Sequence, residues 1–183
     1  MAASRFPRIG ILGGGQLGRM LALAGLRMGC QIRFLSPEPS GSMDGLGEPI
    51  VGDWQDPDVL ARFADGCDVV TVESEWAPLE GLQGIVSDDR LWPPPETLRL
   101  VRDKGLQKRT LAAAGLPTPA FRCCATIDEA LDAAGHFGYP ALLKRYRGSY
   151  DGYGNATVRH PDELRAAWPR LAEDDGLLVE AWA

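Results

Sequence analysis

The first half of the chain alternates short apolar runs with segments that carry apolar residues at helical spacing. Continuous apolar runs predict buried strands, and apolar residues three and four positions apart predict helices. The pattern predicts strands at 8–13, 31–35, 49–51 and 67–72 and helices at 16–28, 57–64 and 78–83. Elements in this order predict a parallel sheet of βαβ units with right-handed crossovers.

A proline run interrupts this pattern at Leu91-Trp-Pro-Pro-Pro95. Proline fixes φ and donates no backbone hydrogen bond, so we expect a domain boundary, with one domain over 1–95 and a second over 96–183. The second half predicts helices at 96–101, 103–114, 127–136 and 162–172, and strands at 120–125, 141–144, 156–159 and 177–180. The fold class expected is α/β.

Composition limits the classes of function. With 183 residues, 45% of them hydrophobic, the chain can bury a core in one domain or in two small ones. Its formal net charge of -6 argues against a nucleic-acid surface, which needs clustered Lys and Arg. No apolar run is long enough to cross a membrane, and no apolar signal core precedes the first strand, so we expect a cytoplasmic protein.

Four cysteines stand at positions 30, 67, 123 and 124, without a CxxC spacing or clustered histidines. This argues against a zinc site, and we expect no metal ligands and reduced thiols. Cys123 and Cys124 are adjacent on a predicted strand, so their side chains should point to opposite faces.

The segment Gly13-Gly-Gly-Gln-Leu-Gly18 lies between a predicted strand and a predicted helix. A GxGxxG turn in this context brings backbone amides and a helix N-terminus to an anion, so we expect a phosphate to bind there. A site for NAD also needs an acidic residue at the end of the second strand. Ser36-Pro37 occupies that place and Glu38 comes too late, so an NAD-dependent oxidoreductase is a disfavoured alternative.

A second glycine-rich segment extends from Lys144 to Asn155 and follows an apolar strand. The lysine ammonium supplies positive charge, and Gly148, Gly152 and Gly154 let backbone N–H groups turn toward anionic oxygens. These features favour a polyphosphate site. From composition alone, a solvated hairpin with a basic edge explains the segment equally well.

Five segments in this order resemble those of a single family. They are Gly-Gly-Gly-Gln-Leu-Gly-Arg-Met at 13–20, Val-Thr-Val-Glu-Ser-Glu at 70–75, Asp103-Lys104 with Lys108, Gly-Leu-Pro-Thr-Pro at 115–119, and the glycine-rich segment 144–155. The chain is similar to the carboxyaminoimidazole ribonucleotide synthetases, ATP-grasp enzymes that form the ATPase subunit of phosphoribosylaminoimidazole carboxylase in purine biosynthesis. The resemblance covers essentially the whole chain, and Tyr150-Asp151-Gly152 is its most specific piece.

The resemblance implies a Rossmann-like pre-ATP-grasp domain with a parallel sheet, followed by the first part of an α+β ATP-grasp domain. The first domain would bind the substrate ribonucleotide rather than NAD. Gln16, Leu17 and Glu73 would contact aminoimidazole ribonucleotide, with Glu75 on the same surface. The family also suggests a homodimer that forms through this domain.

In the second domain, the resemblance implies a site for ATP with magnesium. Lys104 and Lys144 would contact phosphates, and the loop 149–155 would close over them. The segment 180–183 would bind adenine through backbone groups and a carboxylate. The residues implied to bind ATP are Lys104, Lys144, Ser149, Tyr150, Asp151, Gly152, Tyr153, Gly154, Asn155, Glu180, Ala181, Trp182 and Ala183. Tyr150 and Asp151 are also implied to be catalytic.

The implied reaction uses ATP and bicarbonate to form carboxyphosphate, whose carbon dioxide is captured by the amine of the ribonucleotide. Loop closure would protect carboxyphosphate from water. The implied partners are therefore aminoimidazole ribonucleotide, bicarbonate and ATP, with no nucleic acid and no membrane.

The chain departs from the family at several positions. The family usually has arginine at Lys104, glycine at Ser149, lysine or arginine at Tyr153, and glutamine at Asn155. The missing cation at Tyr153 predicts weaker nucleotide binding, and Arg147 is the candidate to compensate for it.

The family's magnesium ligands lie beyond the adenine-binding segment, so we expect none in this chain and expect a fragment that is inactive alone. A non-catalytic nucleotide-binding module is the alternative. The strand 177–180 would lack the neighbouring strands that cover it, which would leave 101–183 less protected than 1–95.

Overall fold

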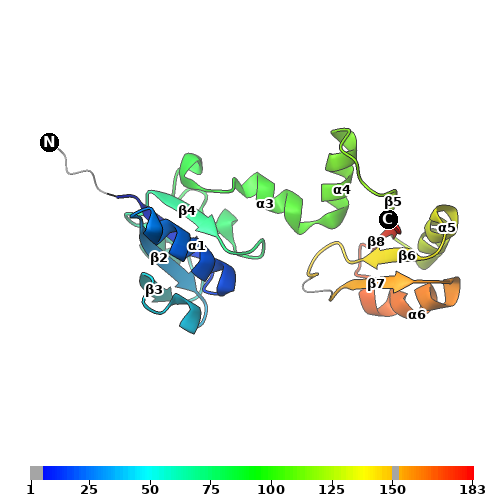
Figure 1. Ribbon diagram of the computed structural model, residues 1–183, viewed down its shortest axis with the longest axis horizontal. Coiled ribbons are helices and arrows are strands. Elements are labelled where there is room, and N and C mark those ends of the chain that lie inside the picture. Colours follow the sequence, from blue (N-terminus) through cyan, green and yellow to red (C-terminus); the bar gives the residue numbers. More distant parts are fainter. Residues whose placement is uncertain (1–5, 150–152) are drawn as a thin grey trace. The chain divides into compact units, whose positions relative to one another are not determined.

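The computed structural model describes residues 6–149 and 153–183 and divides into two compact units, Met1–Leu98 and Arg99–Ala183. Figure 1 shows that each unit has its own sheet. Helix α3 (Pro95–Arg102) runs across the division, so the boundary expected between residues 95 and 96 stays a prediction. Within the described residues, no helix combines the length and the apolar character needed to cross a membrane.

The sheet of the first unit is parallel, with the strand order β3-β2-β1-β4. Its strands are β1 (Arg8–Leu12), β2 (Gln31–Ser36), β3 (Glu48–Val51) and β4 (Val69–Val72). The unit also contains α1 (Gln16–Arg27), α2 (Pro57–Ala64) and 3-10 turns at Gly41–Met43, Leu79–Leu82 and Asp88–Arg90. The predicted parallel Rossmann-like sheet is confirmed.

Helix α1 packs on this sheet through small residues. Gly18, Ala22 and Gly25 are buried, whereas Met20 is 65% exposed. A Cβ on Gly25 would lie 2.9 Å from Ile32 Cδ1, so the helix approaches the sheet more closely than a larger residue allows. The helix predicted from its apolar spacing is confirmed, but its large apolar side chains face outward instead of toward the core.

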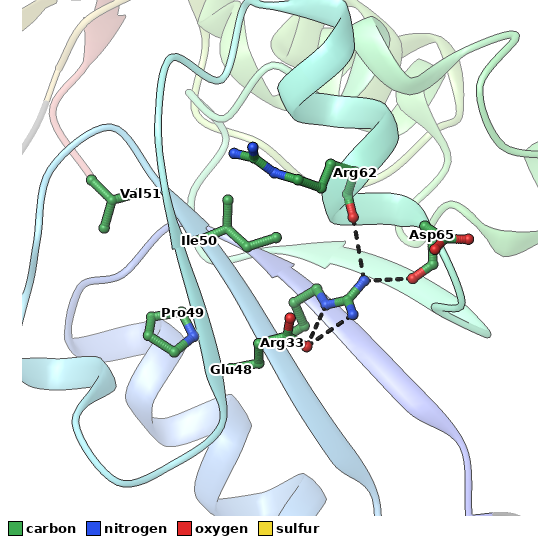
Figure 2. A pocket seen from close by; sticks show the side chains of 7 residues that line it. All are labelled: Arg33, Glu48, Pro49, Ile50, Val51, Arg62 and Asp65. Atoms are coloured by element: carbon green, nitrogen blue, oxygen red, sulfur yellow. Dashed lines mark hydrogen bonds and ion pairs between the residues drawn. The ribbon is translucent and has the colours of Figure 1, made fainter.

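A buried arginine joins the edge of this sheet to the end of α2. The Arg33 guanidinium donates to the backbone carbonyls of Arg62 (3.3 Å), Phe63 (3.1 Å) and Asp65. It also pairs with Glu48 Oε2 at 2.8 Å, in the pocket shown in Figure 2. Carbonyls at a helix C-terminus lack intrahelical partners and carry partial negative charge. Arg33, in β2, therefore caps the C-terminal end of α2. The polar groups of this pocket pair with one another, which indicates a structural role.

The sheet of the second unit is antiparallel, with the strand order β5-β8-β6-β7. Its strands are β5 (Phe121–Cys124), β6 (Ala141–Lys144), β7 (Asn155–Val158) and β8 (Leu177–Ala181). Its further helices are α4 (Lys104–Ala113), α5 (Ile127–Phe137) and α6 (Pro161–Leu171). The predicted change from a parallel sheet to an α+β unit is confirmed.

Strand β8 lies in the middle of this sheet and pairs with β5 on one side and β6 on the other. Leu177, Leu178 and Val179 are fully buried. The expectation that this strand lacks its neighbours was wrong, because β8 forms hydrogen-bonded ladders with both β5 and β6. The lower protection from hydrogen exchange expected for 101–183 rested on this missing pairing, and it therefore has no physical basis.

The two faces of this sheet differ in chemistry. One face packs against α5 and α6 in a hydrophobic core (Figure 1), which includes Cys124, Ala134, Leu143, Leu164, Leu177 and Val179. Burial raises the pKa of the Cys124 thiol to about 11. Cys123 lies outside this core, and its Sγ accepts a hydrogen bond from Arg109 at 3.0 Å. The expected separation of the two cysteines is confirmed, and the second face carries polar side chains together with the buried Leu178.

Candidate functional site

The glycine-rich turn between β1 and α1 already holds an anion that the chain itself supplies. Glu73 Oε2 accepts hydrogen bonds from the backbone N–H groups of Gly15 (2.6 Å) and Gly18 (2.9 Å). The backbone N–H of Glu73 donates to the Leu12 carbonyl over 3.0 Å, which fixes the residue at the carboxyl end of β1. The positive N-terminal end of α1 is therefore neutralised from within the unit.

This arrangement adds a residue to the interpretation of the turn. The helix end already holds one negatively charged group, the Glu73 carboxylate, and the phosphate expected there stays a prediction. A Cβ on Gly15 or Gly18 would lie 2.8 or 2.7 Å from a Glu73 oxygen. These glycines make room for the carboxylate, and a dinucleotide would have to displace it.

Glu73→Ala is expected to lower the free energy of unfolding of the first unit by about 2 kcal/mol, because two N–H groups lose a charged acceptor. Glu73→Gln keeps an acceptor oxygen and should lose about half as much. Glu38→Ala, on the exposed segment after β2, is the matched control. Urea unfolding followed by circular dichroism measures the losses. A loss for Glu73→Ala no larger than that of the control would contradict the capping role.

The residues implied to bind the ribonucleotide gather at this end of the unit. Gln16 and Leu17 form the exposed first turn of α1, between the two glycines that hold Glu73. Glu75 lies two residues after Glu73, is partly buried, and interacts with other groups of the chain. The structure thus places Gln16, Leu17 and Glu73 around one turn, while their contacts with substrate stay predictions.

The second face of this sheet, opposite to the hydrophobic core, carries a buried carboxylate between two lysines. The Glu180 side chain in β8 is 4% exposed, and its Oε2 accepts a hydrogen bond from Lys144 Nζ at 2.7 Å. Lys108 Nζ, from α4, lies 3.0 Å from Glu180 Oε1. We call these three residues the lysine–glutamate cluster. Two cations around one carboxylate leave an excess of positive charge, which suits an anionic ligand.

One oxygen of this carboxylate has no hydrogen bond. Glu180 Oε1 is within ion-pair distance of Lys108, but the angle is outside the hydrogen-bonding range, and the oxygen has no hydrogen-bond partner among the described residues. Coulomb attraction depends on distance and not on the hydrogen-bond angle, so Lys108 and Glu180 still form an ion pair. The oxygen is a buried acceptor that an N–H group of a ligand can satisfy.

Sequence reasoning assigned Lys104, Lys144 and Glu180 to the site but missed Lys108. A signal was available, because Lys108 follows Lys104 by four residues and shares a side of the helix with it. The contact with Glu180 was not accessible from the sequence, because it requires β8 to lie in mid-sheet.

The start of α4 is joined to the end of β6. The Lys104 N–H donates to the Tyr146 carbonyl at 2.9 Å, and the Asp103 side chain caps the helix. Gly105 lies against the Tyr146 ring, where a Cβ would come within 2.8 Å of it. Burial raises the pKa of the Tyr146 hydroxyl. These contacts hold Lys104 beside the start of the glycine loop.

Arg147 is already paired at the base of this loop. Its guanidinium lies 2.8 Å from Asp103 Oδ2 and 3.8 Å from Asp175 Oδ2. Tyr153, where the family usually has a cation, has an exposed side chain. Arg147 therefore ties the loop to α4 in this arrangement, and its role as a substitute cation for phosphate stays a prediction.

The glycine loop is described in part. Three of its residues lie outside the described residues: Tyr150, Asp151 and Gly152. The Arg145 N–H donates to the Gly154 carbonyl over 2.9 Å, and Asn155 pairs with Lys144 across β7 and β6. Ser149 Oγ and Asn155 Oδ1 are buried and have no hydrogen-bond partner in the described part of the chain. Both atoms are buried polar groups without a partner among the described residues.

Strand β8 ends one residue beyond Glu180, at Ala181. The Ala181 N–H donates to the Ala120 carbonyl at 2.8 Å, and Trp182 and Ala183 are exposed. Their contacts with adenine stay predictions. Within residues 6–149 and 153–183, no group of three or more His, Cys, Asp or Glu side chains is placed to hold a metal ion.

More than half of the chain, residues 6–102, matches the sequence profile of the ribonucleotide synthetase preATP-grasp domain. The chain belongs to this preATP-grasp family. Residues 109–183 match the ATP-grasp domain. The ATP-grasp resemblance predicted from the glycine-rich segments is therefore confirmed for both halves of this preATP-grasp chain.

Two relatives of this preATP-grasp chain are named for the synthesis of N5-carboxyaminoimidazole ribonucleotide. The N5-carboxyaminoimidazole ribonucleotide synthase of Pseudomonas aeruginosa is 38% identical over 164 residues, which are 90% of this chain and 46% of that protein. The solved N5-carboxyaminoimidazole ribonucleotide synthetase from Thermus thermophilus is 39% identical, with a TM-score of 0.82 over 96% of this chain and 47% of its own. The chain spans about half the length of these relatives.

A third relative shows ligands. The N5-carboxyaminoimidazole synthase from Aspergillus clavatus was solved in complex with ADP and 5-aminoimidazole ribonucleotide. It is 28% identical to this preATP-grasp chain, with a TM-score of 0.81 over 97% of this chain and 47% of its own.

Proposed function

We propose that this chain serves the ATP-dependent carboxylation of aminoimidazole ribonucleotide with bicarbonate in de novo purine biosynthesis, as part of an ATP-grasp ligase. The first unit would bind the ribonucleotide and the second the adenine nucleotide. Relatives named for this reaction support the proposal, as does the complex of one of them with ADP and 5-aminoimidazole ribonucleotide. The observation that carries it is the lysine–glutamate cluster, a cationic site with a buried acceptor.

The cluster suits both the phosphates and the base of an adenine nucleotide. Lys144, together with Lys104, would supply positive charge to the phosphates. Glu180 Oε1 would accept an N–H from the base, and the backbone of 181–183 would line it. When bound, ATP with magnesium supplies the phosphoryl group that activates bicarbonate. We propose that the ligands of the magnesium ion lie outside the residues of this chain.

The glycine loop would complete the nucleotide site. Ser149, Gly152, Tyr153, Gly154 and Asn155 are proposed to contact ATP. Tyr150 and Asp151 are proposed to bind it and to take part in catalysis. Exclusion of water by this loop would favour carboxylation over hydrolysis.

The ribonucleotide site is proposed around the first glycine turn. Gln16 and Leu17 would contact the ribonucleotide from α1, with Glu73 and Glu75 from the segment after β4. Two backbone amides fix the orientation of the Glu73 carboxylate, which favours a preorganised contact with the substrate.

Isothermal titration calorimetry of the 183-residue chain tests this proposal. We expect saturable binding of ADP and, in a separate titration, saturable binding of aminoimidazole ribonucleotide. NAD should give no saturable signal, because Glu73 occupies the turn that its pyrophosphate needs.

The same titrations separate the alternatives. Binding of ADP without the ribonucleotide would favour a non-catalytic nucleotide-binding module. Binding of NAD without ADP would contradict the ligase and favour a dinucleotide-dependent oxidoreductase.

We also propose a homodimer that forms through the first unit. Its support is the outward face of α1, where five large apolar side chains are exposed: Leu17, Met20, Leu21, Leu23 and Leu26. Exposed apolar patches of this kind mark interaction sites. A cytoplasmic location is proposed from the reaction itself, and it is consistent with four free cysteines.

A further inference from the structure

Lys108 is held by groups from several parts of the second unit. Its ammonium donates to Thr118 Oγ1 at 2.6 Å and lies 5.9 Å from the centroid of the Phe121 ring. Its third neighbour is the Glu180 carboxylate at 3.0 Å. With its side chain 13% exposed, Lys108 has little freedom to turn toward another partner.

Lys144 is placed differently although it contacts the same carboxylate. It ends β6, where the chain enters the glycine loop, and its side chain is 23% exposed. An ammonium on a flexible four-carbon stem can turn from Glu180 toward a phosphate without any change in the strand.

That movement has an electrostatic consequence at Glu180. A buried carboxylate that loses its cation is strongly disfavoured. If Lys144 were the only cation, each contact that it made with a phosphate would be offset by the contact that it gave up. A second ammonium that stays in place removes this conflict.

We propose that Lys108 is a positioning residue that keeps the Glu180 carboxylate paired and in place, so that Lys144 is free to bind the nucleotide phosphates. The inference rests on the nucleotide function proposed above. It assigns separate tasks to two lysines that flank one carboxylate: Lys108 holds the protein's own anion, and Lys144 binds the anion of the ligand.

Titration with ADP, using variants of the 183-residue chain, tests the assignment. Lys108→Gln is expected to bind ADP about 30-fold more weakly, because Lys144 must then stay with Glu180. Lys108→Arg keeps the cation and should bind within about threefold of the unmodified chain. Arg165→Gln removes an exposed cation of α6 that pairs with Asp162, and it should change the affinity by less than about twofold.

A double-mutant cycle separates positioning from a general structural role. In a Glu180→Gln background no buried carboxylate remains, so adding Lys108→Gln should weaken ADP binding by less than about twofold. A structural role through Thr118 and Phe121 would instead give the same loss in both backgrounds. If Lys108→Gln alone fails to fold, the double variant is compared with Glu180→Gln, and a loss of ADP affinity above about twofold between these two would overturn the positioning role.

The outcomes are distinct. Equal losses in the two backgrounds, or unchanged ADP affinity in Lys108→Gln, would overturn the positioning role and leave the proposed function standing. Absence of ADP binding by the unmodified chain would overturn the proposed function, and this inference with it.

Discussion

Lys144→Ala is expected to weaken ADP binding by roughly 100-fold, because the phosphates would lose the charge-assisted contact proposed for Lys144 at the start of the glycine loop. Stability should fall much less, by about 1 kcal/mol. Lys144 is one of two cations at Glu180, and Lys108 remains to neutralise the buried carboxylate after the substitution. Calorimetric titration with ADP and urea unfolding of the same sample measure the two effects.

Two further variants interpret the result. Lys144→Arg keeps the charge and should recover most of the affinity. Arg165→Ala removes a cation that lies on α6 and should leave ADP binding unchanged. Parallel losses of affinity and stability in Lys144→Ala would show that the lysine acts mainly as a structural partner of Glu180.

Gly176→Ala is expected to destabilise the second unit by about 4 kcal/mol or more, which is enough to unfold a marginal domain. Gly176 has a φ of +89°, which disfavours any residue with a Cβ. An added Cβ would also overlap the backbone carbonyl oxygen of Cys124, which cannot rotate away as a side chain can. Thermal and urea unfolding, followed by circular dichroism, measure the loss.

Gly115→Ala is the matched control for this substitution. Gly115 also has a positive φ, +71°, but nothing lies within 4 Å of an added Cβ. Gly115→Ala should lower the free energy of unfolding only by the cost of a positive φ in a residue with a Cβ, about 1–2 kcal/mol. Equal losses at the two positions would mean that the backbone around Cys124 shifts to accept the methyl group.

Most elements of secondary structure were predictable because their signals are local. Helix α2 and strand β6 have the bounds that their apolar patterns predict. The buried face of α1 was not predictable in the same way. Its contact with the sheet depends on three small residues, Gly18, Ala22 and Gly25, which contribute little to an apolar pattern.

The candidate site shows the same limit more sharply. Lys144 and Glu180 were identified from motifs, but their contact depends on which strands are neighbours, and strand order is not encoded in local periodicity. Glu73 was predicted to contact the ribonucleotide, whereas its hydrogen bonds to Gly15 and Gly18 required the alignment of β4 beside β1. In each case the missing information was a long-range pairing.

The central place of β8 sets an order for the folding of the nascent chain. The parallel sheet of the first unit is complete once Val72 has been synthesised. In the second unit, β5 and the β6–β7 hairpin are joined within the sheet through β8, so they share no ladder among the described strands until Leu177–Ala181 leaves the ribosome. Non-local pairing of this kind is slow, because loops must close before contacts reward them. The first unit can therefore fold during synthesis, whereas the second closes its sheet, and brings Glu180 to its two lysines, in one late step.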